Sequence, residues 1–271
     1  MRILEFRIIV PTSLEKYKIG MRHMVNEYVK TTQADGEGIE IVECKPYEKE
    51  NESGIYTYKI FHFKSKIPSF IRWAIPDKYL HIHEKSYNGF PHLFTNEFVP
   101  GMADQLLLSI ETQHFEYKKD MEFPNNSVNL TDEELSQREI IYIDILNGQP
   151  QSDNPNEQIV GFTCPEAGIN TPITEPDGYD PSQPPKWIDN YEGDLMCCVK
   201  VIRFNFKWFG LQTAVEAYVS DIFYPKLFTE SHRKIIGSMK DWYNLTWEEV
   251  RKQEEEIEAK QKEQENLFLK D

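Results

Sequence analysis

The stretch Met196–Leu211 constrains the fold most, because it reads as a strand with two features that do not suit a filled core. The apolar face of this strand consists of Ile202, Phe204, Phe206 and Trp208. Lys200 has the same parity as that face, so its ammonium group is predicted to point inward. The strand ends in Trp208 and Phe209 directly before Gly210, where two adjacent rings cannot both avoid solvent. The inward charge and the exposed aromatic pair together predict a hollow interior with an apolar rim.

A second predicted strand, residues 55–64, also places polar groups on an apolar face. Thr57 and Lys59 share parity with Ile55, Phe61 and Phe63. In the alternative interpretation the tyrosines of the opposite face point inward and Lys59 lies in water. This strand by itself favours neither interpretation.

A third predicted strand, residues 80–88, repeats the pattern, because Glu84 and Asn88 share parity with the aliphatic residues that precede them. Unpaired charges are too costly to bury, so three such strands predict a shared polar patch deep in a cavity. Two lysines beside neutral hydrogen-bonding groups suit a phosphorylated, hydroxyl-rich ligand. The alternative is that the lysines pair with a carboxylate, Glu84 or Asp144, inside a filled core.

The order of the predicted elements indicates an α+β fold in a single domain that spans residues 1–271. A strand at 2–10 precedes a helix that opens with a capping box, Thr12 to Glu15, and ends near Lys30. The remaining predicted strands lie at 39–44, 55–64, 80–88, 105–114, 139–146 and 196–208, with a short helix near Thr131. Most connections are too short for helical crossovers, which favours an antiparallel sheet wrapped around helices.

The last part of the chain is predicted to be a loop followed by helices. Eight of the sixteen prolines fall within residues 149–186, so the segment at about 149–190 is a long proline-rich loop. Apolar residues from Val215 to Trp242 recur at helical spacing, and Pro225 is expected to kink that helix. A second capping box, Thr246 to Glu249, opens a charged tail helix from about residue 247.

The formal net charge of -15 argues against a nucleic-acid partner and against attachment to anionic membranes by overall charge. Any contact with a membrane is then local and largely apolar. The sequence contains neither a signal-peptide core nor an apolar run long enough to span a bilayer. The four cysteines show no CxxC or CxxH spacing. We therefore expect a soluble cytoplasmic protein with reduced thiols.

Catalytic and metal-site signals are weak. The sequence contains no nucleophile elbow, P-loop, dinucleotide-binding glycine pattern or His-Glu-x-x-His motif, so no catalytic residues and no enzyme activity are predicted. His81 and His83 lie on one face of a predicted strand beside Glu84, but a metal site needs a further ligand. Two such histidines are more often ordinary surface residues, and neither a metal nor another cofactor is predicted.

Several strings spread along the chain resemble the class I phosphatidylinositol transfer proteins. Two of them are IHEKSYN at Ile82–Asn88 and FKWFGLQ at Phe206–Gln212. The others are Pro46–Lys49, Gly54–Ile60, Ser65–Pro68, Thr95–Glu97, Ile110–Thr112, Tyr142–Ile145, Met196–Cys197 with Lys200, and Leu227–Thr229. Together these strings are far more specific than any one of them alone.

The resemblance implies a START-like helix-grip fold, in which a concave antiparallel sheet and long helices enclose one phospholipid. It also implies a carrier that exchanges phosphatidylinositol or phosphatidylcholine between membranes without hydrolysis, supports phosphoinositide signalling and contacts membranes only transiently. Lipid kinases are expected as possible partners, and a monomer is expected because one cavity does not require a dimer. The alternatives are a START-like carrier of another lipid, such as phosphatidic acid or sphingomyelin, a regulator that presents lipid to a kinase and, as a weaker third, a lipid-modifying enzyme on a similar scaffold.

The resemblance also assigns site residues. The inositol ring contacts implied by the family fall on Thr57, Lys59, Asn88 and, in the tail helix, Glu255. Further lipid contacts fall on Glu84, Thr95 and Lys200, and the membrane-docking pair falls on Trp208 and Phe209. The charge pattern alone would leave Glu255 on a solvated helix face.

The chain also departs from the family pattern. Phe209 replaces the usual second docking tryptophan, Leu93 stands at about the position of a family cysteine, and Pro225 interrupts a helix that is normally continuous.

Release of the lipid requires a gate, which we expect to consist of Trp208 with Phe209, the segment Phe70–Ile75 and the tail helix.

Overall fold

The computed structural model describes residues 1–31, 38–49, 52–62, 67–150, 153–154, 157–174 and 178–268. Phe63, Ser65 and Lys66, which belong to a predicted strand and to one of the family strings, lie outside these ranges.

Eight strands form one sheet in the order β2-β3-β4-β5-β6-β8-β1-β7. Their bounds are β1 Arg2–Val10, β2 Gly38–Lys49, β3 Glu52–His62, β4 Ile82–Gly89, β5 His92–Phe98, β6 Leu106–Tyr117, β7 Arg138–Ile143 and β8 Leu195–Phe206. Neighbouring strands are antiparallel except β1 and β7, which pair in parallel. The predicted antiparallel sheet is therefore confirmed, except for the parallel edge pair β1–β7. The strand β5, which pairs with β4, was not predicted.

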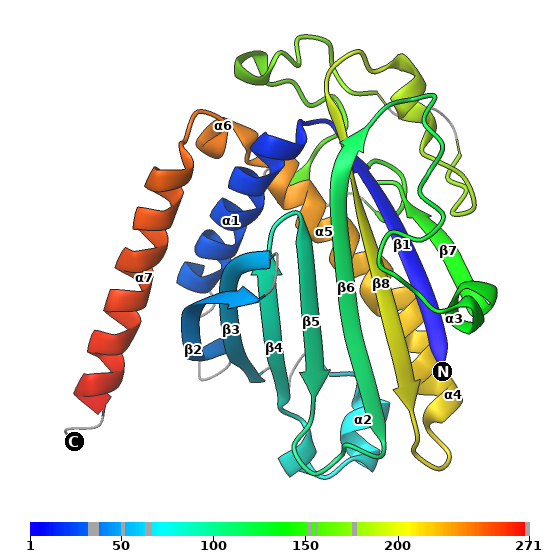
Figure 1. The fold of residues 1–271 in the computed structure, drawn as a ribbon, viewed down its shortest axis with the longest axis vertical. Helices are drawn as coiled ribbons and strands as arrows, with labels where there is room; N and C mark the ends of the chain where they lie inside the picture. Colours follow the sequence, from blue (N-terminus) through cyan, green and yellow to red (C-terminus); the bar gives the residue numbers. More distant parts are fainter. Residues whose placement is uncertain are drawn as a thin grey trace.

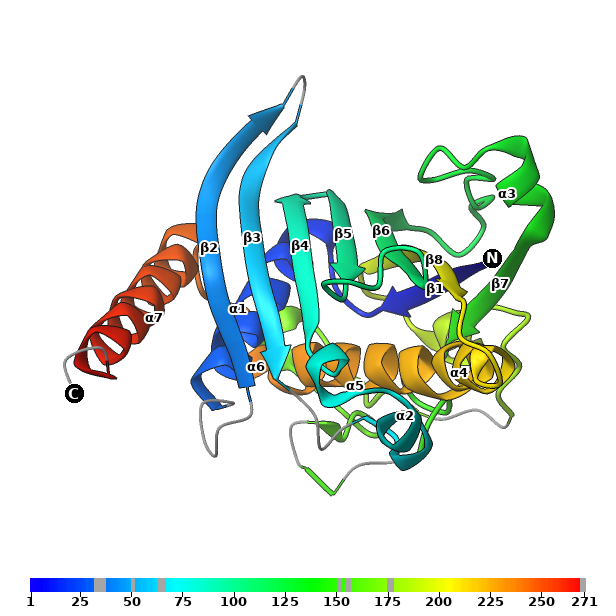
Figure 2. The same ribbon diagram turned by 90° about the horizontal axis from the view of Figure 1, so that it is seen from below.

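The longest helices are α1 Leu14–Thr31, α5 Tyr224–Gly237 and α7 Trp247–Phe268. The shorter elements are α2 Ser69–Ala74, η2 Asp77–Tyr79, α3 Asp132–Gln137, η4 Pro165–Ala167, η5 Lys186–Asn190, α4 Gln212–Tyr218, the π-helical turn η6 Val219–Phe223 and α6 Met239–Trp242. The sheet curves over α1 and α5, and α7 packs on α1 at the β2 side (Figures 1 and 2). The predicted α+β fold with a concave sheet around helices is confirmed.

The two predicted capping boxes have different outcomes. At the start of α7, the backbone nitrogen of Glu249 donates to Thr246 Oγ1, and Thr246 donates back to the Glu249 carboxylate. At the start of α1, the backbone nitrogen of Lys16 donates to Ser13 Oγ instead, so the cap lies one residue later than predicted. Thr12 is buried and its hydroxyl has no hydrogen-bond partner within the described residues.

The helical run between α4 and α5 continues through Pro225 instead of stopping at it. Pro225 occupies the first turn of α5, where its missing N–H removes little hydrogen bonding. The residues just before it, Val219–Phe223, form the π-helical turn, a type of irregularity that can bend a helical run. The interruption expected from Pro225 is thus a local change of helix type.

The proline-rich segment begins against α5. Arg233 is 1% exposed, and its guanidinium group donates to four backbone carbonyl oxygens, those of Ile145, Leu146, Gln149 and Pro150. Trp187 and Ile188 of η5 are buried in the core further along the segment. The described parts of this loop are therefore fixed to the domain by buried side chains, which its composition did not indicate.

Candidate functional site

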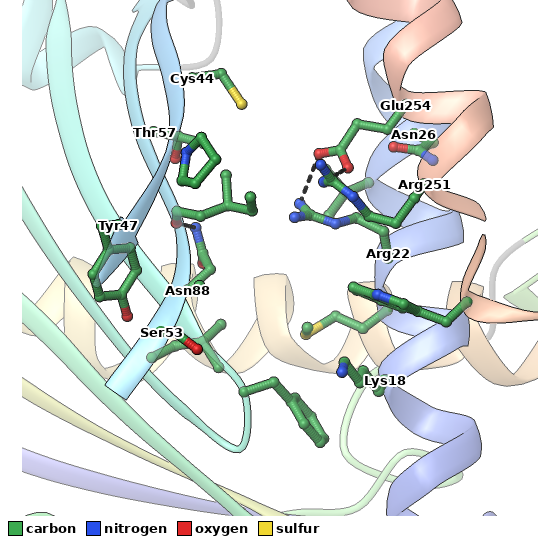
Figure 3. Close-up of a pocket in the computed structure, with 18 of the residues that line it drawn as sticks. Lys18, Arg22, Asn26, Cys44, Tyr47, Ser53, Thr57, Asn88, Arg251 and Glu254 are labelled. Atoms are coloured by element: carbon green, nitrogen blue, oxygen red, sulfur yellow. Dashed lines mark hydrogen bonds and ion pairs between the residues drawn. The ribbon is translucent and has the colours of Figure 1, made fainter. Parts of the chain in front are cut away.

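A cavity of about 760 Å³ lies between the outer strands of the sheet and the helices α1 and α7. One wall is formed by β2, β3 and the end of β4, and the other by one face of α1 and the start of α7 (Figure 3). Its volume lies within the range of ordinary ligand pockets. The hollow interior predicted from the inward polar groups is thus present next to β3.

The sheet wall presents the predicted face of β3 to the cavity. Ile55, Thr57 and Lys59 all line it, so the interpretation that placed Lys59 in water is wrong. Thr57 is 6% exposed, and its hydroxyl has no hydrogen-bond partner within the described residues. A buried hydroxyl without a partner loses free energy unless a ligand or water satisfies it. This group is therefore a ready contact for a polar ligand.

Asn88 lies beside Thr57 and also lines the cavity. Its Nδ2 atom donates to the Ile55 carbonyl oxygen at 3.2 Å, which leaves its other amide groups available. Gly54 makes this approach possible, because a Cβ atom at that position would lie 2.1 Å from the Asn88 carbonyl oxygen. The strand pair β3–β4 therefore depends on glycine at this point.

The remaining polar groups of the sheet form a chain that leads away from the cavity. Lys59 Nζ lies 3.2 Å from Glu84 Oε1, and the Ser86 hydroxyl donates to the same oxygen at 3.0 Å. The hydroxyls of Ser86 and Thr95 lie 2.9 Å apart. Glu84 and Thr95 therefore act behind Lys59, and neither is among the residues that line the described cavity.

Glu97 extends this chain into the space under the sheet. It pairs directly with Glu84 across the β4–β5 ladder. Burial and the neighbouring charge of Glu84 raise the pKa of Glu97 to about 8. Across from these carboxyls, burial raises the pKa of Tyr224 on α5 well above its usual value, and its hydroxyl has no described hydrogen-bond partner. The interior beneath β4 and β5 thus holds polar groups that a filled core would not retain.

Lys200 lies in a separate cluster under the middle of the sheet. Its Nζ atom lies 3.4 Å from Thr112 Oγ1 and 5.4 Å from the centre of the Phe228 ring. Burial, with the charge of Lys200, lowers the pKa of the nearby His114 and His232 to about 3, so both imidazoles are neutral. Lys200 points inward as predicted, but it does not line the described cavity.

The helix wall carries charges that were not predicted. Glu254 of α7 is 8% exposed and lines the cavity together with Lys18, Arg22 and Arg251. Figure 3 shows Arg22, Arg251 and Glu254 directed from the helices into the cavity, on the side opposite Thr57 and Asn88. Glu255, which the family resemblance selected, is exposed and is not a lining residue. The structure therefore brings Thr57, Lys59 and Asn88 together but leaves Glu255 outside, and Glu254 occupies the inward position.

The rim also differs from the prediction in detail. Phe209 is 103% exposed, as expected for a docking residue, whereas Trp208 is half-buried and stacks on Phe206 with ring centres 6.5 Å apart. Trp73 on α2 is 91% exposed and was not predicted as a docking residue. An edge-to-face contact between Phe70 and Tyr218 joins α2 to α4, at the end of the molecule where β8 also ends (Figure 1).

The histidine pair near β4 makes contacts other than metal ligation. The His83 ring lies 2.7 Å from the Tyr58 hydroxyl, and the His81 ring lies 3.2 Å from His62. Among the described residues, no three His, Cys, Asp or Glu side chains are grouped to hold a metal ion. The described helices also include none that is both long and apolar enough to cross a membrane.

Comparison with known proteins gives consistent matches over almost the whole chain. The family model described as "Phosphatidylinositol transfer protein" matches residues 1–259. The phosphatidylinositol transfer protein beta isoform of Bos taurus is 33% identical over 261 residues, which covers 94% of this chain and 92% of that protein. Phosphatidylinositol transfer protein 2 of Dictyostelium discoideum is 33% identical, with 96% of this chain and 95% of that protein covered.

Proposed function

The chain belongs to the phosphatidylinositol transfer protein family, and on that premise we propose that it carries one phosphatidylinositol or phosphatidylcholine molecule between membranes. The curated relatives are named for phosphatidylinositol transfer. The observation that carries the proposal is the cavity beside β3, where the buried Thr57 hydroxyl lacks a described partner and faces Lys59 and Asn88. The carrier we propose is the whole chain, residues 1–271, acting as one domain.

The proposed headgroup contacts are Thr57, Lys59 and Asn88, with Glu84 and Thr95 holding Lys59 in place from behind. Neutral hydrogen-bonding groups next to one lysine suit the hydroxyls and phosphate of an inositol phospholipid. We retain Lys200 as a proposed phosphate contact for a lipid that extends from the cavity toward Phe228. We propose Glu254 in the position that the resemblance gave to Glu255, because only Glu254 lines the cavity.

The acyl chains explain why a carrier needs an enclosed interior. Exposing roughly 30 methylene groups to water at ~0.8 kcal/mol each would cost about 25 kcal/mol. Lipid exchange therefore requires that the protein open only when it touches a membrane. We propose that Phe209 and Trp73 insert into the membrane surface and that α2 and α7 move to release the lipid. Trp208 then supports Phe209 from its half-buried position.

The proposed carrier acts without hydrolysing its lipid, works in the cytoplasm and binds membranes peripherally as a monomer. Delivery of phosphatidylinositol to a lipid kinase would connect it to phosphoinositide signalling. The test is transfer of labelled phosphatidylinositol and phosphatidylcholine from donor to acceptor vesicles, with far less protein than lipid present. We expect both lipids to transfer intact, whereas absence of transfer, or conversion of the lipid to a product, would contradict the proposal.

A further inference from the structure

A buried tyrosine on the concave side of the sheet has a hydroxyl group that no side chain satisfies. Tyr224 of α5 is 1% exposed, and its hydroxyl has no hydrogen-bond partner in the part of the chain that the structure describes. Its ring packs on Phe6 and Phe228, with ring centres 6.5 Å and 5.3 Å away. A buried hydroxyl costs free energy unless a ligand or a water molecule forms a hydrogen bond with it. A polar contact is therefore open at this point of the interior.

Glu97 of β5 is a second group without a partner. It pairs with Glu84 across the β4–β5 ladder, and Glu84 pairs with Lys59 across the β3–β4 ladder, so these three side chains share the concave face. Lys59 lies 3.2 Å from the Glu84 carboxylate, whereas Glu97 makes no hydrogen bond or ion pair with a described residue. The Tyr224 hydroxyl lies within electrostatic reach of both carboxyl groups, because burial and then the charges of Glu97 and Glu84 raise its pKa.

Both unpartnered groups are hydrogen-bond donors at neutral pH. Burial and the charge of Glu84 raise the pKa of Glu97 to about 8, so its carboxyl group keeps its proton at pH 7. A protonated carboxyl group and a phenol each offer one O–H donor. The charge of Glu84 is already paired with that of Lys59, so this part of the interior has no excess charge for an anion to compensate. The two free donors therefore suit an uncharged acceptor oxygen.

The register of the sheet places these donors beyond the proposed headgroup and phosphate contacts. Asn88 and Lys200 belong to one line of paired residues that crosses the sheet through Leu93 and Thr112. Glu97 lies four residues along β5 from Leu93, which is about 13 Å at roughly 3.3 Å per residue. This part of β5 runs toward the end of the molecule where α2 lies (Figure 1).

This placement follows the order of groups in a phospholipid. The glycerol and its two acyl esters come directly after the phosphate, and the acyl chains come after the esters. A lipid with its headgroup at Asn88 and its chains directed toward α2 therefore brings its ester groups to the side of the sheet that carries Glu97. The carbonyl oxygen of an ester is an uncharged acceptor of the kind that the two donors suit.

We propose that Glu97 and Tyr224 form an ester-binding subsite, in which their O–H groups donate hydrogen bonds to the carbonyl oxygens of the acyl esters of the carried lipid. The inference rests on the proposed function, because it assumes that a phospholipid occupies the interior with its headgroup beside β3. It assigns a specificity for the linkage of the chains. Diacyl phospholipids are favoured over dialkyl ether phospholipids, which have the same phosphate but no carbonyl oxygens.

The experiment is a competition between the ester and ether forms of one lipid. The protein is incubated with vesicles that contain equal amounts of dioleoyl phosphatidylcholine and its dioleyl ether analogue, and the bound lipids are quantified by mass spectrometry. A second incubation uses the ester and ether forms of phosphatidylinositol. The wild type is expected to bind the ester form in at least fivefold excess, as about one neutral hydrogen bond predicts.

Tyr224→Phe removes only the hydroxyl group and is expected to lower the ratio of bound ester lipid to bound ether lipid about threefold to tenfold. Glu97→Leu removes the other donor and is expected to lower the ratio similarly, and it serves as the test if Tyr224→Phe does not fold. Glu97→Gln keeps an N–H donor at this position, so it is expected to lower the ratio less than Glu97→Leu.

The matched control is Tyr117→Phe, which removes a hydroxyl group from another buried tyrosine. Tyr117 lies on β6 five residues after Thr112 and therefore points to the convex face, where it packs on Phe123 with ring centres 5.4 Å apart. This variant is expected to leave the ratio unchanged. An equal fall in Tyr117→Phe and Tyr224→Phe would overturn the inference, because the effect would then not depend on the concave face.

The other outcomes separate failure of this inference from failure of the proposed function. Equal binding of ester and ether lipids by the wild type, or a ratio that neither Tyr224→Phe nor Glu97→Leu changes, overturns the inference and leaves the carrier function intact. Loss of both lipids in equal proportion in Tyr224→Phe would assign its hydroxyl to the shared phosphate and also overturn the inference. Uptake of no phospholipid by the wild type in either incubation overturns the inference and the proposed function together.

Discussion

At the scale of single residues, Glu97 gives a prediction about how stability depends on pH. Glu97 faces Glu84 across the ladder, and burial with this charge raises its pKa to about 8. In the unfolded chain the same carboxyl titrates near its ordinary value of 4.5. Between these values the unfolded state releases a proton that the folded state retains, so stability falls as pH rises from about 4.5 to about 8.

We therefore predict that Glu97→Gln reduces the loss of stability on going from pH 5 to pH 8. The amide keeps the shape of the protonated carboxyl but has no charge to bury. The measurement is urea unfolding at the two pH values, with Glu192→Gln, at an exposed position, as the control. An unchanged pH dependence in Glu97→Gln would show that Glu97 is already ionised in the folded protein.

Thr57 gives a prediction about selectivity. Its hydroxyl has no described partner, so Thr57→Val should change the free energy of unfolding by less than about 1 kcal/mol. The same change removes a proposed contact to the inositol ring and should lower the ratio of bound phosphatidylinositol to bound phosphatidylcholine by about fivefold to tenfold. Mass spectrometry of lipids taken up from mixed vesicles measures the ratio. Loss of both lipids in equal proportion would contradict the headgroup assignment.

At the scale of elements, the antiparallel strand pair β3–β4 positions the sheet wall of the cavity. Gly54→Ala should destabilise the protein by about 1–3 kcal/mol, because the new methyl group would meet the Asn88 carbonyl oxygen and push the two strands apart. Ser53→Ala, at the exposed neighbouring position, is the control. Equilibrium unfolding in urea measures both variants. An unaffected Gly54→Ala would mean that the strand pair has more freedom than its geometry indicates.

The elements α2 and the β8–α4 turn give a prediction about membrane contact. Trp73→Ala should weaken vesicle binding and slow lipid transfer about tenfold or more, since insertion of an exposed tryptophan buries a large apolar surface. The lipid already bound should remain, because Trp73 lies outside the described cavity lining. Val160→Ser, at an exposed apolar residue of the proline-rich segment, should leave transfer unchanged. Loss of bound lipid in Trp73→Ala would assign this residue to retention instead of docking.

The element scale also shows how far the sequence could predict the site. Strand parity has only two outcomes, and three strands with the same inward polar pattern were enough to place Thr57, Lys59 and Lys200 under the sheet. In a helix, successive side chains point about 100° apart, so the sequence pattern must fix the rotation of the helix more finely than it fixes the face of a strand. Packing of Val250 and the hydrogen bond from Asn26 to its carbonyl oxygen turn α7 so that Glu254 faces inward and Glu255 outward. That contact joins residues far apart in the chain, and the run of glutamates could not reveal it.

Other features depended on partners that local patterns do not specify. β7, residues 138–143, pairs in parallel with β1 at the start of the chain. The alternation of apolar and polar residues along a strand does not specify which strand it pairs with. The contact of Arg22 with Glu254 requires α1 and α7 to meet, because these two residues lie on separate helices. Trp73 could have been found from the sequence, since it lies in the segment Phe70–Ile75 that was predicted to be part of the gate.

At the scale of the whole molecule, the sheet and helices border a cavity that holds a few polar groups, and two large aromatic side chains, Trp73 and Phe209, are exposed. The family relationship and this architecture support the same account, in which a lipid is enclosed during transit and exchanged at a membrane. The central claim of this account is that the folded protein contains one exchangeable phospholipid.

Native mass spectrometry of the purified protein, before and after incubation with vesicles that contain phosphatidylinositol, tests this claim most directly. The account predicts a one-to-one complex with a phospholipid, and replacement of that lipid by phosphatidylinositol from the vesicles. A folded protein without bound lipid that takes up none from the vesicles would contradict the account, and would mean that the cavity serves another ligand.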